Sequence, residues 1–87
     1  MSEQFKHEAL VENRFKKSFR NIDSEHKKLI FEKMKRLLNN EIQGEYLKGP
    51  YKGLKKVRVG KYRIIYSDHE PCRVIFYDVR PRESAYT

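Results

Sequence analysis

The chain changes its hydrophobic periodicity once, near Gly44. Before that point apolar residues recur every three or four positions, as they do on one face of a helix; after it they alternate with polar residues, as they do along a strand. Glycine and proline residues then divide the second half into short segments. This pattern predicts an α+β fold in which a helical hairpin precedes a small β-sheet, within one domain of residues 1–87.

The first half contains two amphipathic segments. A first helix is predicted over Glu12–Ile22, and Asp23 or Ser24 can cap a second helix that ends near Asn39. The turn between the two helices is expected at Asn21–Ser24. The first helix is expected to bury Phe15, Phe19 and Ile22, and the second to bury Leu29, Ile30, Met34, Leu37 and Leu38.

The second half contains three short segments of strand-like alternation. They are predicted strands at Lys56–Val59, Tyr62–Ser67 and Arg73–Val79. Gly60 and Lys61 form the tight turn of a hairpin, and Asp68–Pro71 forms the next turn. An additional edge strand is possible at Phe5–Leu10.

The strand half also concentrates positive charge. Residues Lys48 to Arg63 contain seven Lys or Arg residues and no acidic residue, and the whole chain carries a net charge of +8. Like charges on a sheet repel one another unless an anion binds them, which favours a polyanionic partner such as nucleic acid. The alternative is that the lysines are solvated charges that protect an edge strand from aggregation.

The tyrosines, like the dense positive charge, are concentrated in the second half of the chain, since all six lie after Gly44. A phenol ring can pack against a sheet or stack on a nucleobase. Basic residues interleaved with tyrosines on a sheet suit binding of single-stranded RNA.

Other classes of protein are disfavoured. No apolar run is long enough to span a bilayer and no secretory signal is present, so we expect a cytoplasmic protein. Cys72 is the only cysteine, and we expect it to be a small buried residue. His7, His26 and His69 are too widely separated to suggest a metal site, and no cofactor is predicted.

Two segments carry a resemblance to a known family. The segments LKGPYKGLKKVRVGKYRIIY at 47–66 and VIFYDVRPRESAY at 74–86 resemble the RelE/ParE superfamily of toxins from toxin–antitoxin systems. The resemblance implies a helical hairpin packed on a small curved antiparallel β-sheet. It also implies a cognate antitoxin as partner. RelE-like members cleave mRNA in the ribosomal A site, whereas ParE-like members inhibit DNA gyrase.

The resemblance also suggests functional residues and favours the RelE-like branch, with the ribosome and mRNA as targets. Arg63 matches the arginine of the family's "Y-R-I-I-Y" strand, and Arg82 and Tyr86 match the C-terminal Arg and Tyr. The predicted catalytic residues are Arg63, Arg82, Tyr86, Lys52 and Lys55. The predicted RNA-binding residues are Lys48, Lys56, Arg58, Lys61 and Arg80.

The chemistry of metal-independent RNA cleavage explains these choices. The 2′-hydroxyl attacks the adjacent phosphate, so the protein must accept its proton, neutralise the phosphorane and protonate the leaving 5′-oxygen. Arg63 and Arg82 suit the second task, because a guanidinium can grip two phosphate oxygens. A lysine such as Lys52 or Lys55 can act as the base if neighbouring cations lower its pKa, and Tyr86 can stack on a base.

Several alternatives remain open at this point. Arg63 can form a structural ion pair with an acid such as Asp78, and Tyr86 can be frayed near the end of the chain. The function can also be gyrase inhibition, or antitoxin binding by a catalytically inactive relative.

Overall fold

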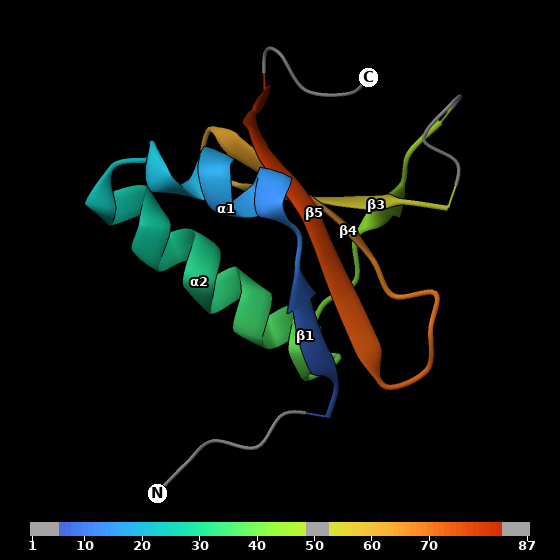
Figure 1. Cartoon of the computed structure of the whole chain (residues 1–87). Helices are drawn as coiled ribbons and strands as arrows, with labels where there is room; N and C mark the ends of the chain where they lie inside the picture. The colour runs from blue at the N-terminus through green and yellow to red at the C-terminus, as the bar shows by residue number, and fades with distance from the viewer. Residues whose placement is uncertain (1–5, 49–52, 83–87) are drawn as a thin grey trace, which may run out of the picture.

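The computed structural model describes residues 6–48 and 53–82 of the chain. Two helices, α1 (Asn13–Arg20) and α2 (Ser24–Leu38), follow a short first strand, as Figure 1 shows. The hairpin predicted from the sequence is confirmed, although α1 ends before Ile22. The backbone N–H groups of Asn21 and Ile22 bond to carbonyls three residues earlier, which closes the helix with a tight turn.

Asp23 rather than Ser24 caps α2. One of its carboxylate oxygens accepts a hydrogen bond from the backbone N–H of His26 at 3.1 Å. The same carboxylate lies 2.9 Å from His26 Nδ1, and this interaction lowers the pKa of Asp23. Asn39 ends α2, and Asn40 adopts a left-handed conformation with φ 59°.

The five strands form one mixed sheet in the order β1-β5-β4-β3-β2. Their bounds are β1 Glu8–Val11, β2 Glu45–Tyr46, β3 Lys55–Val59, β4 Tyr62–Ser67 and β5 Arg73–Pro81. The predicted antiparallel pairing of the three C-terminal strands is confirmed. β1 lies beside β5 in parallel, because the intervening helices and strands supply the long crossover that parallel pairing requires. β2 was not expected from the sequence.

One face of the sheet packs on the helices to form the core. Phe15 of α1 contacts Phe76 of β5 with ring centroids 5.8 Å apart, and Ile30 of α2 is fully buried. Each such side chain contributes about 1.5–3 kcal/mol of burial free energy. The other core residues include Ile22, Leu37, Leu38, Val59, Ile64, Val74 and Val79.

Two expectations about burial are wrong. Leu29 is 48% exposed, because it lies at the edge of the apolar stripe of α2. Cys72 is also exposed, since it lies in the turn before β5 with φ 63°. Turn residues lie at the surface whatever their polarity. No helix among the described residues is long and apolar enough to cross a bilayer.

Candidate functional site

Three arginines lie side by side on the face of the sheet opposite the core. In the strand register Arg58 of β3 faces Arg63 of β4, and Arg63 faces Arg80 of β5. Directly opposed residues project to the same face with Cβ atoms about 4.5–5.5 Å apart. The neighbouring positions Val57, Ile64 and Val79 alternate to the face that packs on the core. We call Arg58, Arg63 and Arg80 the arginine row.

The strands that carry the arginine row contain one acidic residue, Asp78. Arg80 Nη1 lies 3.6 Å from the buried carboxylate of Asp78. Arg58 is exposed, and Arg63 and Arg80 are half-buried, so all three remain accessible to solvent. Such a row is suited to binding phosphate groups.

A hollow of approximately 270 Å³ lies beside the arginine row. Among the described residues, Glu45 is the one acid that lines it, and in the register Glu45 faces Lys56 of β3. The hollow, here called the Glu45 hollow, is lined by Gln43, Gly44, Glu45, Lys56, Val57, Arg58 and Arg63. Glu45 was not expected at the site, because it precedes the basic segment in the sequence and only the pairing of β2 with β3 brings it beside Lys56.

Gly44 allows the chain to lie close enough to β3 to form this hollow. A Cβ atom at Gly44 would overlap the carbonyl oxygen of Lys56 and would lie 2.8 Å from the hydroxyl of Tyr66. The backbone N–H of Gly44 donates a hydrogen bond to that hydroxyl at 2.7 Å. Burial raises the pKa of Tyr66, so the phenol is held neutral in this position.

Lys55 is not part of the hollow. It is buried, its Nζ lies 3.0 Å from Asp68 Oδ2, and it sits over the ring of Tyr46 at 4.8 Å from the centroid. Burial favours a lower pKa, but the hydrogen bond and charge of Asp68 outweigh burial and raise the pKa of Lys55. The expectation that crowding lowers the pKa of Lys55 is therefore wrong, and its contacts are those of a structural ion pair.

The remaining candidates are distributed around this face. Lys61 is exposed in the turn between β3 and β4, and its carbonyl accepts a hydrogen bond from the backbone N–H of Arg82 at 2.9 Å. Arg82 follows β5, and its buried Nε has no hydrogen-bond partner within the described part of the chain. Lys48 is exposed. Lys52 and Tyr86 lie outside the described residues.

The structure therefore brings together Lys56 and the arginine row, and separates Lys55 from them. Within residues 6–48 and 53–82, no group of three or more His, Cys, Asp or Glu side chains is placed to hold a metal ion.

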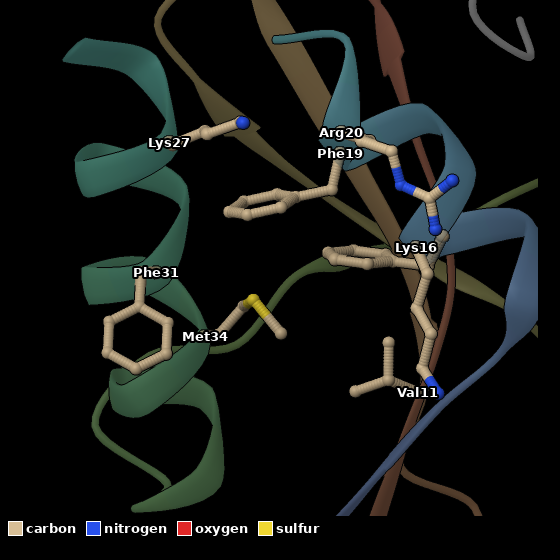
Figure 2. A pocket seen from close by; sticks show the side chains of 8 residues that line it. Val11, Lys16, Phe19, Arg20, Lys27, Phe31 and Met34 are labelled. Carbon is tan, nitrogen blue, oxygen red and sulfur yellow. The ribbon is translucent and has the colours of Figure 1, made fainter. Parts of the chain in front are cut away.

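A second surface lies between the two helices. It is an apolar groove of approximately 460 Å³, here called the helix groove, and Figure 2 shows Phe19 and Met34 pointing toward each other across it. Phe31 at its edge is 55% exposed. Lys27 Nζ lies 5.6 Å from the centroid of the Phe19 ring. The groove is lined by Val11, Phe15, Phe19, Phe31 and Met34, together with the cations Lys16, Arg20 and Lys27.

Fold and sequence together place the chain in a class of toxins. Residues 7–86 match the family model described as the ParE toxin of the type II toxin–antitoxin system parDE. The chain belongs to this family, and is thus a type II toxin of the RelE/ParE superfamily. No curated protein shows significant sequence similarity to it.

Solved structures of related folds include both RelE and YafQ proteins. The RelBE2 toxin–antitoxin complex from Mycobacterium tuberculosis contains a chain 19% identical to this one, with a TM-score of 0.76, covering 87% of this chain and 98% of that one. YafQ from E. coli is 17% identical, with a TM-score of 0.77, and the match covers 93% of this chain and 99% of YafQ. The RelB–RelE complex from Methanococcus jannaschii contains a chain that is 28% identical, with a TM-score of 0.64. The match covers 86% of this chain and 92% of that one.

Proposed function

We propose that this toxin is a ribosome-dependent endoribonuclease that cleaves mRNA in the A site without a metal ion and so inhibits translation in the cytoplasm. The observation that carries the proposal is the arginine row beside the Glu45 hollow, on an accessible face of the sheet. The resemblance of the fold to RelE and YafQ structures is consistent with it.

Arg63 and Arg80 bind the scissile phosphate in this mechanism. They are direct neighbours across β4 and β5, so two planar guanidinium groups can contact the same phosphate. Their positive charge stabilises the phosphorane more than the ground state, because negative charge increases on the phosphate oxygens during attack. Arg58 and Lys61 extend the positive surface along the RNA backbone.

Glu45 and Lys56 carry out proton transfer. A carboxylate beside the arginine row can accept the proton of the 2′-hydroxyl, and an ammonium group can donate a proton to the departing 5′-oxygen. Glu45 replaces Lys55 as the candidate base, because Lys55 is buried against Asp68. The predicted catalytic roles of Lys52, Arg82 and Tyr86, and the predicted RNA-binding role of Lys48, remain part of the proposal.

The phosphate-binding role is tested by replacing Arg63. In a cell-free translation extract, Arg63→Ala should lower the rate of mRNA cleavage by about 100–1000-fold, and Arg63→Lys should restore only part of it. Arg73→Ala is the matched control, since Arg73 is similarly half-buried at the other end of β5 and pairs with Glu8 and Glu70. Unchanged cleavage by Arg63→Ala would rule out the assigned role.

Glu45→Gln tests the base. It should lower the cleavage rate by about 100–10,000-fold while RNA binding is retained. Glu41→Gln, an exposed change in the preceding loop, should leave the rate unchanged. Equal rates for the two variants would remove Glu45 from the mechanism.

Gyrase inhibition is the competing function, and the family model carries the name ParE. Wild-type protein is therefore added to a gyrase supercoiling reaction in parallel with the translation extract. Loss of supercoiling with intact mRNA would replace the proposed nuclease by a gyrase inhibitor. Inactivity in both reactions would favour a catalytically inactive relative that only binds antitoxin.

The cognate antitoxin binds the helix groove in this proposal. The names of the Mycobacterium tuberculosis and Methanococcus jannaschii structures describe toxin–antitoxin complexes, which supports an antitoxin as partner. The groove combines exposed aromatic surface with three cations, and no acid lines it in the part of the chain that the structure describes. It is therefore complementary to a segment with an apolar ridge and flanking carboxylates.

A further inference from the structure

A second hollow lies on the same face of the sheet as the arginine row. Its volume is approximately 300 Å³. Ile65 and Asp78, which face each other across β4 and β5, form part of its wall. This hollow, here called the Tyr77 hollow, is lined by Glu12, Asn13, Arg14, Leu54, Ile65, Tyr77 and Asp78.

The Tyr77 hollow is close to the proposed phosphate site. Ile65 is two residues after Arg63 on β4, and Asp78 is two residues before Arg80 on β5. Residues two apart on a strand project to the same face about 6.6–6.8 Å apart. A nucleotide with its phosphate at the arginine row can therefore place its base in the hollow.

A bulge between β4 and β5 produces the aromatic wall. Ile65 faces Asp78 and Tyr66 faces Phe76, so Tyr77 is the extra residue that has no partner in the register. Its half-buried side chain lines the hollow beside the aliphatic residues Leu54 and Ile65. An aromatic ring with apolar neighbours suits stacking of a nucleobase.

The polar wall comes from the start of α1. Glu12 is the N-cap residue, yet its side chain forms no capping hydrogen bond. Its carboxylate can therefore accept a hydrogen bond from a ligand, whereas the Asp78 carboxylate already accepts one from Ser18 Oγ at 2.9 Å. Asn13 and Arg14 add amide and guanidinium groups, which can bond to the edges of a base.

We propose that the Tyr77 hollow binds an unpaired nucleobase next to the phosphate held by Arg63 and Arg80, and that it sets the base preference of cleavage. The inference rests on the proposed nuclease function. The acidic acceptor Glu12 favours bases that carry an exocyclic amino group, namely adenine, cytosine and guanine, over uracil, which has none.

The experiment is an NMR titration of the ¹⁵N-labelled protein with four 2′-O-methyl dinucleotides, AA, CC, GG and UU. The 2′-O-methyl group prevents cleavage, so binding is measured without activity. All four should shift the amide signals of Arg63 and Arg80. AA, CC or GG should also shift Asn13, Ile65 and Tyr77, and the best of them should bind about 5-fold or more tightly than UU.

Two variants assign the effect to the hollow. Glu12→Gln should reduce the preference over UU to less than about 2-fold while the shifts at Arg63 persist, because only the acidic acceptor is changed. Tyr77→Leu should weaken all four dinucleotides, since it removes the stacking ring but keeps apolar bulk. Glu25→Gln, at the exposed start of α2, is the matched control and should change nothing.

The outcomes separate this inference from the proposed function. Shifts at Arg63 and Arg80 without any at Asn13, Ile65 and Tyr77 would overturn the base site and leave the phosphate site intact. Undiminished preference in Glu12→Gln would likewise overturn it. If no dinucleotide shifts Arg63 or Arg80, the proposed RNA-binding function fails, and the base site with it.

Discussion

Lys55 and Lys56 are neighbours in the chain but have opposite environments. Alternation along β3 directs Lys55 into a buried contact with Asp68 and Lys56 into the Glu45 hollow. The sequence shows only that the two side chains point to opposite faces of the strand. It does not show which face is buried until one residue of the strand is assigned to a face. For this reason the sequence could not show that Lys55, the predicted catalytic lysine, is buried, and that Lys56, which was predicted to bind RNA, lines the hollow.

Gly44→Ala should destabilise the protein by about 1–3 kcal/mol, because the added methyl group would overlap the backbone carbonyl of Lys56. Urea unfolding measures the change in free energy. Gln43→Ala, at an exposed neighbouring position, should change the free energy by less than about 0.5 kcal/mol. Equal stability of the two variants would show that this segment can move away from β3 without cost.

Because of the Lys55–Asp68 ion pair, the free energy of unfolding should decrease at alkaline pH. The pKa of Lys55 is raised in the folded state, so its contribution is complete below the unfolded pKa and is lost as pH rises through the folded pKa. Tyr66, whose pKa is also raised, acts in the same direction. Unfolding free energy should therefore fall above about pH 10.

Asp68→Asn separates these two contributions. It should cost about 1–3 kcal/mol near neutral pH, because it leaves the buried ammonium of Lys55 without its charged partner. It should also make the alkaline decrease in unfolding free energy less steep, since the Lys55 contribution is lost while burial still raises the pKa of Tyr66. Parallel curves for wild type and variant between about pH 8 and pH 11 would contradict this assignment.

At the level of secondary structure, the two helices pack on the sheet with one face and line the helix groove with another. Phe15 of α1 and Ile30 of α2 are buried against the sheet, whereas Phe31 is exposed at the helix groove. Periodicity predicted both helices because the apolar stripe is a local property of the chain. It could not predict the groove, which depends on how far apart two helices pack.

Phe31→Ser should weaken binding of the cognate antitoxin by about 10–100-fold, because a phenylalanine contributes about 1.5–3 kcal/mol when its apolar surface is buried. Isothermal titration calorimetry with the purified antitoxin measures the affinity. Leu29→Ser is the matched control, since Leu29 is similarly exposed on α2 but lies outside the groove. Equal losses of affinity in both variants would place the antitoxin elsewhere.

Across the whole molecule, the arginine row and the helix groove are separate surfaces. The arginines alternate with core residues along β3, β4 and β5, whereas the groove lies between α1 and α2. The net charge of +8 predicts strong, salt-dependent binding of polyanions. The charge alone does not indicate which cations form a binding surface.

The salt dependence of RNA affinity measures how many cations contact phosphate groups. For a single-stranded RNA oligonucleotide, log K should fall linearly with log salt, and each lost phosphate contact should reduce the slope by about 0.7. Arg58→Ala should show this reduction in fluorescence anisotropy, whereas Lys28→Ala on the exposed face of α2 should retain the wild-type slope. An unchanged slope for Arg58→Ala would remove Arg58 from the RNA path.

The helices, the three C-terminal strands and the basic character of the second half follow from local patterns: apolar spacing, turn residues and charge. Strand register decided two other features. It aligns Arg58, Arg63 and Arg80 across three strands, and it places Glu45 beside them. Register depends on pairings between residues distant in the chain, and on a bulge at Tyr77 that shifts the alternation by one residue. A one-residue slip would turn the arginine row toward the core, so the tertiary structure alone assembles this face.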